Sequence, residues 1–91
     1  MIKTDTEWLT LMDEWRVPAH LHNGLMNYLA HHRSTGDFLH AVLTNRLMEA
    51  VTRADDDSLA GILSLMRFLY NEAPAVSYGS PERVDTWLSQ I

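Results

Sequence analysis

Imidazole groups are the first candidates for chemistry in this sequence, which contains five histidines and no cysteine. Imidazole binds zinc, nickel and copper, and two ligands on one helix must lie three or four residues apart to converge on an ion. On a helix, His20 and His22 point about 200° apart, and the adjacent His31 and His32 about 100° apart. His40 stands alone on the next helical segment. We therefore interpret the histidines as solvated or partly packed and expect no metal or cofactor, with a metal site assembled between helices as the alternative.

Three consecutive acidic residues, Asp55, Asp56 and Asp57, could hold a hard cation, which requires several oxygens around one point. The run lacks both the glycine and the distal glutamate of an EF-hand loop. Aspartate at the start of a helix caps the backbone and interacts favourably with the helix dipole. The run therefore predicts a helix start rather than a cation site.

Hydrolysis would need a nucleophile, a base and a group that stabilises negative charge, all held in register. Serine hydroxyls are present at Ser58, Ser64, Ser77 and Ser80. None of them lies in a nucleophile elbow, a phosphate-binding loop or a paired-carboxylate motif. The sequence predicts no catalytic residues, and we expect a protein that is not an enzyme.

The loop at 77–80, before the last predicted helix, is the best candidate for a small-ligand site, because backbone amides at a helix start can hold an anion. A nucleotide or similar ligand would there meet Arg67, Asn71 and Tyr78 together with the amides near Ser80. A plain helix cap by Ser80 needs nothing beyond the capping rule and is the simpler interpretation.

Aromatic and arginine side chains are the other candidates for recognition, since both are enriched among binding hot spots. Trp8, Trp15 and Trp87 lie on the short terminal helices, and we interpret them as clamps that hold these helices to the core. An exposed aromatic anchor for a protein partner is the alternative. The candidate partner-binding residues of the middle helices and the loop are Arg46, Glu49, Arg53, Arg67, Asn71 and Tyr78.

Composition limits the class of protein. The 91 residues correspond to a single domain, residues 1–91, with one modest core, and 46% apolar and 21% charged residues are ordinary for a globular protein. The polar start of the chain and the lack of an apolar run of about 20 residues predict a cytoplasmic protein with no secretory signal and no membrane span. A net charge of −5 argues against nucleic-acid binding, which depends on Lys and Arg.

Apolar residues recur at helical spacing along the chain, and no segment alternates with period two for long enough to suggest a sheet. Thr4 and Glu7 have capping-box spacing and predict a helix of about ten residues that stops before Pro18. Pro18 is the predicted first residue of a second helix. We attribute Gly24, in the middle of this helix, to the close approach of a neighbouring helix.

Two longer helices are predicted in the centre of the chain. Asp37 is the predicted cap of a third helix that runs to about Arg53, with Thr44 on its polar side. A fourth helix starts in the aspartate run and ends at Pro74. Because it is apolar around more than half of its circumference, we expect it at the centre of the core.

A last short helix is predicted from Ser80 and Pro81, a cap followed by proline at the first helical position. Its apolar side consists of Val84, Trp87, Leu88 and Ile91. The sequence thus predicts an all-α fold, a compact bundle of about five short helices in a single domain. The apolar surface of the fourth helix and of the end helices exceeds what one small core covers, which predicts a homo-oligomer, most simply a dimer.

Several short motifs occur together over roughly residues 18–87: GDFL at 36–39, AVLTN at 41–45, RAD at 53–55, FLYNEAP at 68–74 and GSPE at 79–82, followed by Trp87. This joint pattern resembles a family of small proteins encoded by tailed bacteriophages and prophages. The resemblance implies a phage origin and action inside an infected bacterium, and it supplies no activity and no site residues. Small phage proteins without catalytic motifs often bind host or defence proteins.

The expected function is therefore that of a non-enzymatic, phage-encoded accessory protein that binds and modulates a host protein. A defence system such as a CRISPR effector is one candidate target. The alternative is a helical protein that binds a small ligand or a nucleotide.

Overall fold

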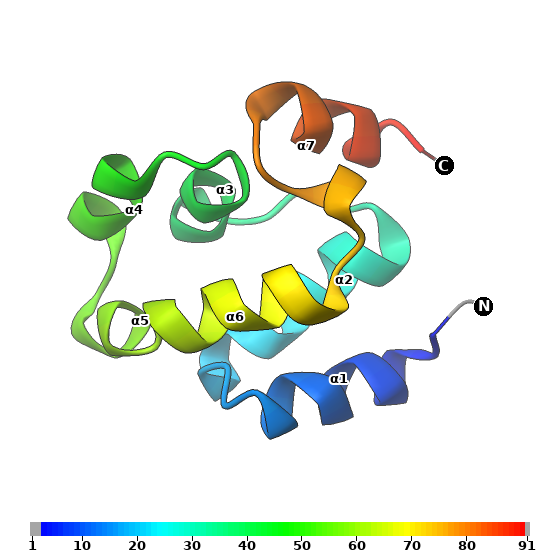
Figure 1. Ribbon diagram of the computed structural model, residues 1–91, viewed down its shortest axis with the longest axis horizontal. Coiled ribbons are helices and arrows are strands. Elements are labelled where there is room, and N and C mark those ends of the chain that lie inside the picture. Colours follow the sequence, from blue (N-terminus) through cyan, green and yellow to red (C-terminus); the bar gives the residue numbers. More distant parts are fainter. Residues whose placement is uncertain (1–2, 91) are drawn as a thin grey trace.

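The computed structural model describes residues 3–90, and every regular element in this range is helical (Figure 1). The elements are α1 (Asp5–Glu14), η1 (Ala19–Leu21), α2 (His22–His31), α3 (Asp37–Leu43), α4 (Leu47–Arg53), α5 (Asp56–Ala60), α6 (Ile62–Glu72), η2 (Ala75–Ser77) and α7 (Pro81–Leu88), where η denotes a 3-10 turn. The predicted all-α class is confirmed. The expected number of about five helices is wrong, because two predicted helices are each divided in two. Ile91, expected on the last helix, lies outside the described residues.

Three predicted helix starts are present as side-chain caps. The Thr4 hydroxyl accepts a hydrogen bond from the Glu7 amide, and the Glu7 carboxylate accepts one from the Thr4 amide, at 3.1 and 3.0 Å. The first residue of the aspartate run, Asp55, accepts from the amide of Ser58 at 2.7 Å. Ser80 caps α7 in the same way. These caps satisfy amide groups that a short helix would otherwise leave unpaired.

Two other predicted helix starts need correction. Gly36, not Asp37, is the residue that precedes α3, and it makes no side-chain cap. Asp37 is the first residue of the helix, and its carboxylate instead pairs with Arg53 at 3.2 Å. Pro18 precedes the 3-10 turn η1, which leads into α2, so it lies outside the α-helix that it was expected to begin.

The predicted helix from 37 to 53 is divided at Asn45, whose φ of 63° is left-handed and incompatible with a helix interior. Asparagine tolerates this conformation better than most residues. Thr44, expected on the polar side, is buried, and its hydroxyl donates to the carbonyls of His40 and Ala41. As a result α4 turns away from the direction of α3 (Figure 1).

The predicted helix from the aspartate run to Pro74 is divided at Gly61. A Cβ atom at this position would lie 2.1 Å from Cγ of Pro18, so only glycine permits the contact between these two segments. The Gly61 amide still donates to the carbonyl of Asp57, and α5 therefore runs directly into α6 (Figure 1). At Gly24, a Cβ would lie 3.4 Å from Cδ1 of Leu39, as expected for the close approach of another helix.

The core gathers side chains from α1, α2, α3, α6 and α7. On α6, Leu65 and Phe68 are fully buried, and the Trp8 ring meets the Phe68 ring edge-on with centroids 6.2 Å apart. The buried cluster consists of Trp8, Met12, Val17, Leu21, Leu25, Tyr28, Leu29, Leu39, Leu43, Leu65, Phe68, Leu69 and Val84. One side of α6 is thus central to the core, as predicted, whereas the opposite side is exposed.

Hydrogen bonds from aromatic side chains attach the terminal helices. The buried Tyr28 hydroxyl donates to the carbonyl of Ser77 in η2, and the Trp87 indole donates to the carbonyl of Tyr28 at 2.8 Å. The Trp15 indole donates to the Glu72 carboxylate, also at 2.8 Å. Trp8 is buried. The prediction that the tryptophans clamp the end helices is confirmed.

We expect Gly61→Ala to lower the free energy of unfolding by roughly 1–3 kcal/mol, because the added methyl group overpacks the contact with Pro18. An unconstrained helix position would show the opposite sign, a gain of about 1 kcal/mol. Urea unfolding checks the result. In a Pro18→Ala background the same substitution should be tolerated, and a stabilised Gly61→Ala single variant would contradict the close packing.

The buried phenol provides a second test. Burial raises the pKa of Tyr28 from 10.0 to about 12. Because the pKa of Tyr28 is higher in the folded state, its contribution to the free energy of unfolding is complete below the ordinary pKa. That contribution is lost as the pH rises towards the pKa of the folded state. Alkaline titration of phenolate absorbance should show a step with a pKa of about 12 in the wild type, and Tyr28→Phe should remove that step. Full ionisation of all tyrosines in one step near pH 10 would contradict this burial.

Candidate interaction surface

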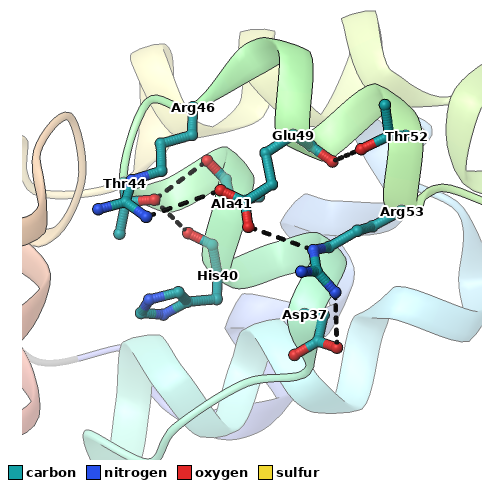
Figure 2. A network of polar contacts seen from close by, with 8 residues as sticks. All are labelled: Asp37, His40, Ala41, Thr44, Arg46, Glu49, Thr52 and Arg53. Atoms are coloured by element: carbon teal, nitrogen blue, oxygen red, sulfur yellow. Dashed lines mark hydrogen bonds and ion pairs between the residues drawn. The ribbon is translucent and has the colours of Figure 1, made fainter.

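A chain of ion pairs orders the polar side of α4 (Figure 2). Arg46 lies 3.6 Å from Glu49, and the Nε atom of Arg53 lies 3.2 Å from the same carboxylate. The guanidinium of Arg53 also reaches Asp37 at the start of α3, at 3.2 Å. Thr52 donates to the carbonyl of Glu49. Exposed pairs of this kind contribute little stability one by one, but together they restrict the rotamers of these long side chains.

The structure therefore brings three of the predicted partner-binding residues together, namely Arg46, Glu49 and Arg53, but pairs them with one another. Arg67 and Asn71 lie one turn apart on the exposed side of α6, where the Asn71 amide donates to the Arg67 carbonyl. No described contact joins these two residues to the α4 pairs.

Apolar side chains are exposed on α4, α5 and α6. Met48 and Tyr70 are the most exposed, at 80% and 79%. The large apolar side chains that are well exposed in the described part of the chain all lie between residues 47 and 76: Leu47, Met48, Val51, Leu59, Leu63, Met66, Tyr70 and Val76. Soluble monomers rarely expose so many large apolar groups in one region. The uncovered apolar surface of the fourth predicted helix was expected from the sequence, whereas the exposed Leu47, Met48 and Val51 of α4 were not.

An apolar groove lies between α6 and the end of α3 with the turn that follows it. It consists of two adjoining hollows of about 230 and about 50 Å³, which share Val42, Asn45 and Met66 as lining residues. Leu47 lines its α4 side, and Tyr70 lines its α6 side. The left-handed turn at Asn45 places Leu47, the first residue of α4, beside this groove.

Tyr78 forms one end of the groove. The amide of Gly79 donates to the Leu43 carbonyl at 2.7 Å, which holds this loop against the last turn of α3. The Arg83 guanidinium reaches the carbonyls of Ala75 and Tyr78 at 3.1 and 3.4 Å. The loop is thus fastened by a backbone hydrogen bond to α3 and by the side chain of Arg83 in α7, and Ser80 acts as the plain helix cap that the sequence favours.

One serine and one histidine are in contact. The Oγ atom of buried Ser58 lies 2.8 Å from Nε2 of His20, and Oδ1 of Asp55 lies 3.9 Å from the same nitrogen. In a Ser–His–Asp triad the carboxylate binds the other ring nitrogen, Nδ1, and so orients the base. The three residues therefore have the arrangement of a helix start packed against η1 rather than that of a hydrolase.

A third hollow, of about 280 Å³, lies among α1, α2, α6 and α7 and is lined by aromatic rings and by Glu72. The ammonium of Lys3 already lies over the Trp8 ring, 4.9 Å from its centre. His32 stacks on Trp87 and its Nδ1 atom bonds to the Trp87 carbonyl. The polar groups of this hollow are engaged with the chain itself.

No protein family, curated protein or solved structure matches this chain. Among residues 3–90, no three histidine or acidic side chains converge so that they could share a metal ion. No helix in the same range combines the length and the apolar character of a membrane span.

The caps give a test in acid. The Ser58 amide, by its hydrogen bond, holds the pKa of Asp55 below its ordinary value of 3.8, and the Thr4 amide lowers that of Glu7. Depressed pKa values mean that the stabilisation is complete above the ordinary values and is lost as the pH falls through the folded ones. Asp55→Asn keeps a capping oxygen but cannot titrate. We expect the urea midpoints of the wild type and of Asp55→Asn to become more alike as the pH falls from 5 to about 2. The midpoints of the wild type and of Asp85→Asn should not approach each other in this way, because Asp85→Asn removes no cap.

Proposed function

We propose that this protein is a non-enzymatic, phage-encoded accessory factor that binds and modulates a host protein through the surface of α4 and the adjoining groove. The observation that carries the proposal is the exposed apolar ridge of α4, formed by Leu47, Met48 and Val51. Methionine adapts its shape to irregular partner surfaces, which suits an anchor at the centre of an interface. The proposed setting is the cytoplasm of the infected bacterium.

The amount of exposed apolar surface supports a macromolecular partner. At roughly 200 Å² for a fully exposed large side chain, Leu47, Met48 and Val51 of α4 present about 350 Å². One side of a standard protein–protein interface covers about 800 Å², so the ridge would form the apolar centre of such an interface. A patch of about 300–600 Å² is the largest on an ordinary monomer and is often functional.

The ion pairs of α4 support the same assignment. Arg46, Glu49 and Arg53 border the apolar ridge, and their mutual pairing already restricts their rotamers (Figure 2). Ordering long side chains is one of the main costs of association. Side chains that are ordered in advance form a polar rim at a lower entropic cost when a partner covers the ridge.

The alternative, a small ligand or nucleotide, has weaker support. The larger hollow of the groove, at about 230 Å³, is below the roughly 300–1,000 Å³ of typical ligand pockets. Tyr78 lines this hollow, whereas Arg67 and Asn71 do not. At the start of α7, Ser80 accepts the hydrogen bond of the Arg83 amide, and the Arg83 side chain bonds to the loop carbonyls.

Affinity capture from infected-cell lysate tests the proposal. The wild type should retrieve one dominant host protein, a defence component such as a CRISPR effector being one candidate, and Met48→Glu should reduce its recovery by about tenfold or more because it places a charge at the interface centre. Asn23→Glu, on the exposed face of α2, is the matched control and should bind like the wild type. Equal recovery by Met48→Glu and the wild type would remove α4 from the interface, and a wild type that retrieves nothing would sink the proposal.

A further inference from the structure

The outer side of α5 and α6 carries a second apolar feature, here called the α5–α6 stripe, which shares two residues with the groove: Leu59, Leu63, Met66 and Tyr70. Their spacing of four, three and four residues is that of the a and d positions in a coiled coil. The four side chains are 43%, 58%, 44% and 79% exposed. This spacing suits packing against another helix along the whole length of the stripe.

Two exposed charged residues lie near the stripe, one towards each end. Asp56 is the first residue of α5, and Arg67 lies in α6 between Met66 and Tyr70. Neither makes an ion pair with another residue of 3–90, in contrast to the arginines of α4. The stripe thus has an unpaired negative charge near one end and an unpaired positive charge towards the other.

This pattern is complementary to itself. If two copies pair antiparallel about a two-fold axis at Leu63, Tyr70 lies level with the partner's Asp56, since each is seven residues from Leu63. In the same half of the interface, Met66 is offset by one residue from the partner's Leu59, and Arg67 by three residues from the partner's Asp56. The two copies of Arg67 are offset by eight residues, so each lies closer to an opposite charge than to its own copy.

We propose that this protein forms an isologous homodimer in which the α5–α6 stripes of two copies pack antiparallel about Leu63, closed at each end by Arg67 and the partner's Asp56. Every contact of such an interface occurs twice, as two-fold symmetry requires. A different partner with an apolar helix could cover the stripe, but it would not explain why the charges at the two ends complement each other.

The area indicates a reversible dimer. By the same measure of roughly 200 Å² for a fully exposed large side chain, the stripe presents about 450 Å² on each copy. With its flanking charges, the pair buries about 1,000 Å² in total, which is at the low end for specific interfaces. We therefore expect an equilibrium between monomer and dimer that depends on protein concentration.

The dimer goes beyond the proposed function and uses a different ridge. Met48, on α4, does not belong to the stripe, so Met48→Glu should abolish capture of the host protein and leave the dimer intact. Met66 and Tyr70 border both the groove and the stripe, and variants at these two positions would not separate the two proposals. Variants at Asp56, Leu63 and Arg67 would.

Sedimentation equilibrium from about 10 µM to 1 mM tests the dimer, with circular dichroism and urea unfolding to verify the fold of each variant. Arg67→Glu and Asp56→Lys should each raise the dissociation constant by about tenfold or more, because each places like charges together. Leu63→Glu should be monomeric. The double variant Asp56→Lys with Arg67→Glu should dimerise like the wild type.

The sharpest arm is an equimolar mixture of the two single charge variants. In the mixed dimer, Lys at position 56 of one chain faces Glu at position 67 of the other, and the remaining Asp56 and Arg67 also pair, so dimers should return. General damage to the fold cannot be repaired by mixing. A wild type that is monomeric at 1 mM, a mixture that stays monomeric, or a dimer that only Met48→Glu disrupts would each overturn the proposal.

Discussion

One physical constraint governs this structure: α6 has more apolar surface than the rest of a 91-residue chain can cover. Leu65 and Phe68 on one side of the helix are fully buried, and the terminal helices and α2 fold around them. Leu63 and Tyr70 on the other side are exposed. The same helix thus supplies the main hydrophobic stabilisation of the fold and one wall of the surface that we assign to recognition.

The chain breaks determine where that surface lies. The helices are short, from 5 to 11 residues, and helices of this length are held mainly by tertiary packing. Asn45 redirects the chain after α3, so that Leu47 of α4 reaches the groove beside α6. Gly61 admits the ring of Pro18 at the break between α5 and α6. The hydrogen bond from the Tyr28 hydroxyl to the Ser77 carbonyl then holds η2 against α2 and positions the loop that contains Tyr78. Each turn is local, but together they leave the apolar sides of three helices uncovered.

The sequence predicted what depends on neighbouring residues. Each cap at Thr4, Asp55 and Ser80 is made by a side chain that accepts a hydrogen bond from the amide three residues later in the sequence. All three predicted caps are present. The break at Gly61 depends on Pro18, more than 40 residues away, and helical periodicity continues through it. Three of the polar residues predicted for binding pair with one another in the structure. This pairing was not predicted, because hydropathy patterns do not show which charges lie close together in space.

The two proposals assign different physical roles to two sets of charges. On α4, Arg53 is satisfied within its own protomer, so a partner that covers this ridge meets a rim of ordered side chains whose charges need no counterion from it. On α5 and α6, Arg67 and Asp56 make no such pairs among the described residues, so burying them requires charges supplied from outside. A second copy supplies both at once. In that dimer each protomer still presents its α4 ridge, and two ridges on one particle would raise the apparent affinity for a target that is itself repeated or dimeric, without any new contact.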